Sequence, residues 1–330
     1  LIGFHLARGN VEWTLPDYEP MSRAIVSAES GHALVPLVGV LGLLIGMLRK
    51  VGRREDGTMI ALVAAVTAAA SLALVLCFGF ARAGDPEGAT WTLAIYTVAA
   101  LFAAAVVPRS AVAGVAAALL LLTLLQAIAF RWNAALALER PGIVALLAHA
   151  TAMIVGLAVT AWRPNRLAHW WIPFRWWAAV SSVAAAGLLV AVTPSTPTAS
   201  LAAYAAWLAA VWLGTSLLTG WALMFTAAQV AALAAIFAGV VAAVETREWY
   251  LAARHPWLDP WFVQALGLSL AGFCLICGAV RWWFARMTAR REAFVIEEPA
   301  PMWYANAGRV LNAPWPAVDH VVEALLVIAL

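Results

Sequence analysis

The stretch that decides the fold covers residues 176–244 and opens with WWAAVSSVAAAGLLVAV at 176–192. It contains no Asp, Glu, Lys, Arg or His. A transmembrane helix needs roughly 20 apolar residues, because the hydrocarbon core is about 30 Å thick and each helical residue adds about 1.5 Å. The stretch is too long for one crossing, and its turn signals are Pro194-Ser195-Thr196-Pro197 and Thr219-Gly220. We therefore expect three consecutive membrane helices here.

The composition of the whole chain agrees with this interpretation. Of its 330 residues, 65% are hydrophobic and 11% are charged, whereas soluble domains carry about 25% charged residues. Backbone groups inside a bilayer must be paired within the protein, which leaves helix bundles or closed barrels. The apolar runs are rich in Ala, Leu and Val and lack sustained alternation, which favours helices. We expect a single integral membrane domain, an all-α polytopic transmembrane helix bundle with about ten spans.

Charged and turn-forming residues divide the rest of the chain into similar apolar runs. We expect spans at 32–48, 58–80, 90–107, 111–130, 143–162 and 261–280, with a tenth beginning near Val318. Between them we expect an external segment at 8–31, an external loop at 245–260 and a cytoplasmic loop at 281–317. Because the chain begins at Leu1 and stops within an apolar run, both termini look like cuts in a longer polypeptide.

The distribution of basic residues predicts the orientation, because Lys and Arg accumulate in cytoplasmic loops. When the loops are assigned to alternate sides, most of the 20 Lys and Arg fall on one side. That side holds the segments bounded by Arg49 and Arg54, by Arg163 and Arg175, and by Arg281 and Arg309. We expect it to face the cytoplasm of a bacterial inner membrane. The alternation requires three crossings within 176–244, which supports that division.

Most of the 18 tryptophans lie in loops or at the ends of the expected spans. Indole rings favour the headgroup level of a bilayer, so we interpret these residues as interfacial anchors. Several stand beside arginines, a pattern that also occurs in nucleic-acid binding. Their position at helix ends instead favours membrane lipids and other membrane subunits as partners, and no nucleic acid. This group is Trp170, Trp171, Trp176, Trp177, Trp282 and Trp283.

The expected external loop at 245–260 is the clearest polar cluster. His255 or Glu248 would act as a general base, and Arg247 and Arg254 would grip a diphosphate. The aromatic rings beside these charges are suited to sugar binding, and they belong to Trp249 and Trp257. The alternative is an ordinary interfacial loop lying on lipid headgroups.

A second acidic feature lies in the opening segment, where Asp17 and Glu19 are two residues apart. Such carboxylates suit a divalent cation held against a pyrophosphate. In its two acids and its location, Asp17-Tyr18-Glu19 is similar to the acidic pair in the first external loop of membrane glycosyltransferases that use polyprenyl-linked sugars. The layout also resembles that of O-antigen ligases. The resemblance implies an enzyme that acts on lipid-linked sugars at the outer face, with a solvated turn as the alternative.

His149 is the one histidine deep within an expected span, and an ionisable group at that depth is a candidate functional residue. It would ligate a haem or chlorophyll-type pigment, relay protons, or bond to a neighbouring helix carbonyl. The competing function is therefore a non-catalytic membrane subunit that binds a pigment or lipid. A third is a carrier for a neutral or lipidic substrate, because the expected spans lack the mid-membrane charges of ion-coupled transporters.

Three weaker patterns are interpreted structurally. The small residues Gly39, Gly42 and Gly46 suit close helix packing. The C-x-x-C of Cys274 and Cys277 has no second ligand pair in the sequence and is interpreted as helix packing. Asp319, His320 and Glu323 suit either a metal or proton site or the complement of a helix dipole.

Overall fold

The computed structural model describes residues 1–9, 18–81, 86–293, 302–311 and 315–329. Every regular element in these residues is helical, and nine of the helices are long and apolar enough to cross a membrane. This confirms the all-α polytopic bundle and indicates a multi-pass membrane protein. The elements are α1 (Ile2–Ala7), α2 (Tyr18–Ile25), α3 (Ala28–Lys50), α4 (Arg54–Phe78), α5 (Pro86–Val106), α6 (Ser110–Leu125), the π-helical turn η1 (Gln126–Arg131), α7 (Asn133–Leu136), α8 (Pro141–Trp162), α9 (Pro164–Val192), the short 3-10 turn η2 (Thr193–Ser195), α10 (Thr198–Thr219), α11 (Ala222–Val244), α12 (Glu248–Ala252), the short turn η3 (Pro256–Leu258), α13 (Pro260–Ala293), α14 (Met302–Leu311) and α15 (Pro316–Ala329).

The uncharged stretch is divided as the sequence predicts, into most of α9 and the whole of α10 and α11. The first break is η2 with its flanking prolines. The second is Gly220, which ends α10 in the left-handed conformation with φ 74°. Glycine reaches this conformation without the steric cost of a Cβ atom. Both breaks fall at the turn signals, so three crossings follow from the sequence.

The largest difference from the expected boundaries lies near the C-terminal part of the chain. The structure continues α13 through Arg281 to Ala293 and forms α14 within the expected loop at 281–317. At about 1.5 Å per residue, α13 is about 50 Å long and extends well beyond the hydrocarbon core. The expected tenth span corresponds to α15, whose 14 residues are fewer than a full crossing needs.

The first span also begins earlier than expected, because α3 starts at Ala28 rather than at residue 32. Ser27 caps it, since the Ser27 Oγ accepts a hydrogen bond from the Ser30 N–H over 3.3 Å. The expected external segment is therefore shorter by these residues.

The chain forms two compact units. Unit 1 comprises Leu1–Ala103 and Leu119–Leu138, and unit 2 comprises Ala104–Ala118 and Glu139–Leu330. In unit 1, α3 and α4 pack as an antiparallel pair. The Ser71 hydroxyl on α4 donates to the Gly31 carbonyl on α3 over 2.6 Å. The pair therefore meets closely at a glycine.

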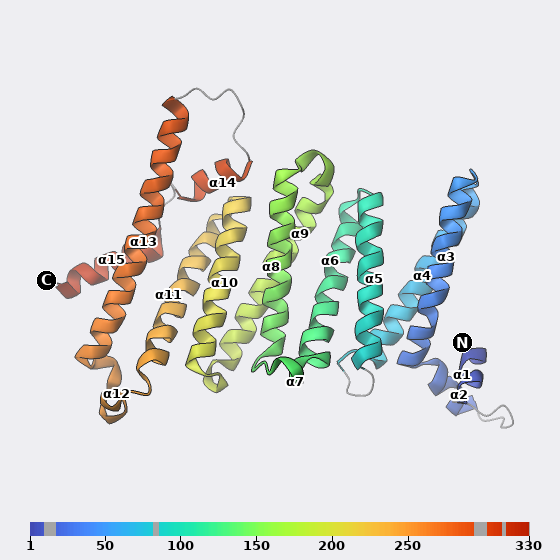
Figure 1. The fold of residues 1–330 in the computed structure, drawn as a ribbon, viewed down its shortest axis with the longest axis horizontal. Helices are drawn as coiled ribbons and strands as arrows, with labels where there is room; N and C mark the ends of the chain where they lie inside the picture. Colours follow the sequence, from blue (N-terminus) through green and yellow to red (C-terminus); the bar gives the residue numbers. More distant parts are fainter. Residues whose placement is uncertain (10–17, 82–85, 294–301, 312–314, 330) are drawn as a thin grey trace. The chain divides into compact units, whose positions relative to one another are not determined.

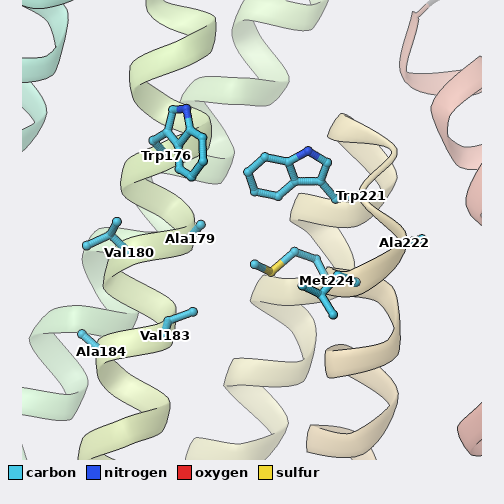
Figure 2. A pocket seen from close by; sticks show the side chains of 9 residues that line it. Trp176, Ala179, Val180, Val183, Ala184, Trp221, Ala222 and Met224 are labelled. Atoms are coloured by element: carbon cyan, nitrogen blue, oxygen red, sulfur yellow. The ribbon is translucent and has the colours of Figure 1, made fainter.

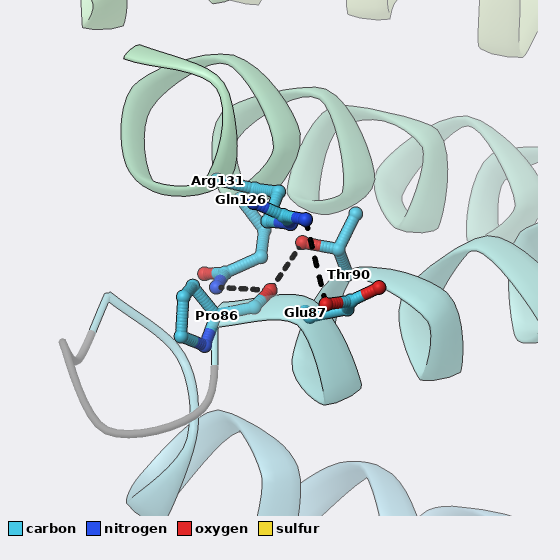
Figure 3. A network of polar contacts seen from close by, with 5 residues as sticks. All are labelled: Pro86, Glu87, Thr90, Gln126 and Arg131. Carbon is cyan, nitrogen blue, oxygen red and sulfur yellow. Dashed lines mark hydrogen bonds and ion pairs between the residues drawn. The ribbon is translucent and has the colours of Figure 1, made fainter. Parts of the chain in front are cut away.

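A polar network in unit 1 joins η1 to the start of α5, and Figure 3 shows its members. Gln126 is fully buried, with both amide atoms hydrogen-bonded. Its Oε1 accepts from the Ala81 N–H over 3.0 Å, and its Nε2 donates to the Pro86 carbonyl over 3.4 Å. Arg131 and Glu87 form an ion pair at 3.4 Å beside it. Satisfied amides of this kind are the norm for buried polar groups.

Unit 2 contains the segment Ala104–Ala118, two helical hairpins and a C-terminal group of helices, and the helices can be followed in Figure 1. One hairpin is α8 with α9, and the other is α10 with α11. α10 also packs against α8 and α9, while α13 and α15 lie against α11. α14 lies at the C-terminal end of α10, where the Asn306 Nδ2 donates to the Leu218 carbonyl over 2.6 Å.

The helices of unit 2 have two chemically different ends. At the first, which we call the Arg140 end, the Arg140 Nε donates to the Thr196 Oγ1 over 3.0 Å. Thr198 there donates to Glu245 over 2.6 Å, so the starts of α8 and α10 lie beside the end of α11. The opposite end, which we call the Gly220 end, carries the α10–α11 turn. The loop expected to be external, 245–260, lies at the Arg140 end, and the segments expected to be cytoplasmic begin at Arg163 and Arg281 toward the Gly220 end.

Candidate functional site

The charged residues of the expected external loop lie at the Arg140 end and do not converge. Arg247, Glu248, Arg254 and His255 are all exposed. Their side chains make no hydrogen bond or ion pair with the described part of the chain. Their roles in catalysis and diphosphate binding stay predictions.

The aromatic residues of this loop attach it to the helices. Trp257 stacks on Phe237 of α11 with ring centroids 5.7 Å apart, and it meets Phe262 of α13 edge-on at 5.4 Å. Trp249 contacts Tyr250 edge-on at 5.8 Å. One face of Trp257 is therefore occupied by the protein itself, which suits an interfacial anchor as well as it suits a sugar platform.

The predicted acidic pair falls at the edge of the described region. Asp17 lies outside the described residues. Glu19 belongs to α2, but the structure describes only its backbone. Among the residues that the structure describes, no three His, Cys, Asp or Glu side chains are grouped as a metal site. Asp319 is exposed, and His320 contacts Glu323 at 3.3 Å.

His149 is fully buried at the centre of α8, with both ring nitrogens hydrogen-bonded. The Ala117 carbonyl accepts from the Nε2–H over 3.0 Å, so the neutral ring accepts from the Ser181 hydroxyl at Nδ1 over 2.7 Å. The imidazole therefore joins α6, α8 and α9. Trp177 meets its ring edge-on at 6.1 Å. A pigment-ligating His149 would first have to lose one of these hydrogen bonds.

A different group of residues gathers at the Gly220 end, where arginines lie over tryptophan rings. Arg163 lies over Trp162 at 5.8 Å, Arg281 over Trp315 at 6.0 Å and Arg286 over Trp282 at 5.1 Å. All the described Arg–Trp contacts of unit 2 are at this end. Tryptophan is the best aromatic partner for a cation, and such contacts are typical of a membrane interface.

Arg175 differs from these arginines because it contacts two indole rings. Its Cζ lies 4.7 Å from the Trp221 ring centroid and 5.8 Å from that of Trp176. The Arg175 Nε is buried without a hydrogen-bond partner, and no described carboxylate pairs with the guanidinium. This donor therefore lacks the hydrogen bond that most buried polar groups make.

An apolar groove of about 800 Å³ adjoins these two indoles, between α9 and the start of α11. Figure 2 shows Trp176 and Trp221 side by side at one end of it, with Ala179, Val183 and Met224 farther along. The groove lies within unit 2, and we call it the α9–α11 groove. Its walls are almost entirely carbon, and the two rings beside Arg175 close one end of it. The arrangement suits a molecule with an anionic end and a long apolar body.

A second cation lies close to the α10–α11 turn. A methyl group on Gly220 would lie 3.1 Å from the Asn306 Oδ1 and 3.5 Å from the Arg309 Nη1. Arg309 is exposed and, like Arg175, has no described anionic partner. Two guanidinium groups therefore lie close to the α10–α11 turn, Arg175 at Trp221 and Arg309 at Gly220.

Substitution of Gly220 with alanine tests whether this turn holds the Gly220 end together. Alanine at this position should lower the free energy of unfolding by about 1–3 kcal/mol, because the φ is left-handed and the new Cβ atom would lie close to Asn306. The matched control is Gly187→Ala, because Gly187 lies within α9 with open space around it and alanine favours helix. Thermal unfolding of the two purified variants in one detergent gives the comparison, and equal midpoints would contradict the assigned role.

The fold and the Gly220 end together define an all-α, multi-pass membrane protein with an apolar groove whose two tryptophans also contact Arg175. Comparison of the chain with protein-family models, with curated proteins and with solved structures finds no match. The Arg175-Trp176-Trp177 segment is visible in the sequence as an interfacial cluster. The contact of Arg175 with Trp221 is not, because it joins residues on different helices.

Proposed function

We propose that this protein binds a phosphate-bearing lipid in the α9–α11 groove. The observation that carries the proposal is the Arg175 guanidinium, which lies beside the contacting indole pair of Trp176 and Trp221 without an anionic partner among the described residues. Arginine suits phosphate because its planar fork presents several N–H donors, and such charge-assisted hydrogen bonds are strong. The lipid tail would occupy the apolar walls of the groove.

The depth of Arg175 supports a headgroup at this point. Val192 ends α9, and the segment from Arg175 to Val192 is about 26 Å long at 1.5 Å per residue. That length is close to the thickness of the hydrocarbon core, about 30 Å. The guanidinium would then lie near the headgroup level, where anionic lipids attract basic side chains.

This proposal retains lipid binding from the predicted activity and treats sugar transfer as a separate question. A polyprenyl-linked sugar is itself a phosphate-bearing lipid, so the groove suits the lipid part of such a substrate. Transfer of the sugar by His255 or Glu248 is a further proposal that rests on exposed loop residues, and a role for Asp17 and Glu19 rests on side chains outside the described residues. Those loop residues lie at the Arg140 end, opposite the groove.

The experiment compares Arg175→Gln with Arg163→Gln in detergent-purified protein. Arg163 is the matched control because it is exposed and contacts a single indole. Native mass spectrometry should show phosphatidylglycerol binding to the wild type and to Arg163→Gln, with affinity for Arg175→Gln lower by about tenfold or more. Hydrogen bonds to charged groups contribute about 1.5–3 kcal/mol, and 1.4 kcal/mol is tenfold.

Two further arms of the same experiment identify the source of the phosphate. Phosphatidylcholine should bind more weakly than phosphatidylglycerol, because its choline group neutralises the phosphate charge. Inorganic phosphate should also bind more weakly, because it has no acyl chain to fill the groove. Equal affinity of Arg175→Gln and Arg163→Gln for phosphatidylglycerol would overturn the proposal. Tight binding of inorganic phosphate alone would assign the site to a soluble anion rather than to a lipid.

A further inference from the structure

A second cavity, independent of the α9–α11 groove, lies between α10, α11 and α13 in unit 2. Its volume is about 290 Å³. Leu217, Phe225, Phe273 and Trp315 are among its lining residues, so the walls are mainly hydrocarbon and aromatic. One lining residue breaks this pattern, because Gln229 of α11 carries an amide.

Gln229 is 4% exposed, and neither its Oε1 nor its Nε2 has a hydrogen-bond partner in the described part of the chain. The contrast with Gln126 is direct, since that buried amide uses both of its polar atoms. Gln229 lies within a membrane-spanning helix, where neither bulk water nor lipid tails can satisfy it. An unpaired amide at such a position is unfavourable unless another group completes it.

The other polar groups around the cavity do not supply that partner. The Trp315 Nε1–H already donates to the Leu311 carbonyl over 3.2 Å. Cys277 brings a thiol, which is a weak hydrogen-bonding group. A buried water needs about two to four polar partners, and apolar cavities stay empty of water. A ligand with its own polar end and an apolar body fits these walls better.

The amide determines which polar end fits. Its carbonyl and its N–H lie side by side, so the complementary group must donate one hydrogen bond and accept another in the same plane. A protonated carboxylic acid does both, with its O–H donating to the Gln229 Oε1 and its carbonyl accepting from the Nε2. An apolar cavity favours this neutral form of the acid, because burial disfavours the charged form.

We propose that this cavity binds a long-chain carboxylic acid in its protonated form, paired with the Gln229 amide. The chain of the acid would lie along the apolar wall formed by α10 and α13. This site differs in chemistry from the α9–α11 groove, whose lining residues carry no amide side chain and whose two indoles contact Arg175. It stands whether or not the groove binds a phospholipid.

The test uses two photoreactive probes, a diazirine-bearing dodecanoic acid and its methyl ester, with labelled peptides identified by mass spectrometry. The ester retains the acceptor and loses the donor. The variants are Gln229→Leu, which removes both amide groups, and Ala232→Phe, which fills the cavity. The matched control is Ala184→Phe, which places the same ring in the α9–α11 groove instead.

The acid should label peptides of α10, α11 or α13 in the wild type and in Ala184→Phe. Labelling should fall at least fivefold in Gln229→Leu and in Ala232→Phe. The ester should label the wild type less than the acid does, and Gln229→Leu should lower ester labelling by a smaller factor than it lowers acid labelling. Unchanged acid labelling in Gln229→Leu, equal labelling of the wild type by acid and ester, or an equal fall for both probes would each overturn the proposal. Gln229→Leu removes an unpaired polar group, so the test does not depend on a destabilised variant.

Discussion

The His149→Ala variant is expected to lose about 2–4 kcal/mol of unfolding free energy, one of the largest effects of any single substitution in this protein. The substitution opens a cavity at a fully buried position and leaves the Ser181 hydroxyl and the Ala117 carbonyl without the imidazole. Cavity formation and the loss of buried hydrogen bonds both destabilise. The expected range is moderate because hydrogen bonds between membrane helices average about 0.6 kcal/mol each.

Thermal unfolding of the purified variant, followed together with its visible absorbance, measures this effect. The matched variant is Ser181→Ala, which removes one of the two hydrogen bonds and leaves the ring in place, with an expected cost of about 1 kcal/mol. A purified wild-type protein with visible absorbance that disappears in His149→Ala without a change in the unfolding midpoint would contradict the structural role. That result would favour the pigment-binding interpretation.

The Gly31→Ala variant is the second substitution expected to have a large effect. A Cβ atom on Gly31 would lie 2.9 Å from the Ser71 carbonyl oxygen and 2.7 Å from the Val75 Cγ2 on α4. One of these neighbours is backbone, so α3 and α4 would have to separate. Such overpacking costs about 1–3 kcal/mol, and Gly31→Val should cost more. The hydrogen bond from Ser71 to the Gly31 carbonyl would also lengthen.

Gly39→Ala is the control for this prediction, because Gly39 lies on the same helix with open space around it. Alanine is favoured over glycine in a helix by about 0.5–1 kcal/mol, so this variant should be as stable as the wild type or slightly more stable. The midpoint of unfolding in a fixed detergent compares the two. An equal response of both variants would show that the approach of α3 to α4 at Gly31 is not limiting.

The glycines show where the sequence interpretation succeeds and where it fails. The Thr219-Gly220 pair is predicted to form a turn, and the positive φ of Gly220 agrees with this prediction. Gly39, Gly42 and Gly46 are predicted as a packing surface, but no described atom lies within 4 Å of a Cβ at any of them. The close contact is instead at Gly31, because the face that α3 turns toward α4 depends on the rotation of both helices. A list of small residues in one helix does not contain that information.

The candidate sites divide in the same way. The sequence identifies the residue types at His149, Arg175 and Gln229. Only the partners distinguish them. Both ring nitrogens of His149 are hydrogen-bonded to neighbouring helices, and Arg175 lies beside indoles from α9 and the α10–α11 turn. The Gln229 amide has no hydrogen-bond partner among the described residues and lines a cavity. The loop residues Glu248 and His255 form a convincing cluster along the chain, yet their side chains are exposed and do not meet.

The sequence by itself determined that the chain is a membrane-spanning helical protein and where most of its membrane helices lie, although α9 begins at Pro164 and α13 continues to Ala293, both beyond their expected bounds. The reason is that hydrocarbon thickness and the need to pair backbone groups act on each segment separately, so apolar length and turn residues suffice. Only the tertiary structure decided which polar groups are satisfied and where the groove and the cavity lie. Those properties depend on contacts between residues of different helices, such as Arg175 with Trp221, and no single segment encodes them.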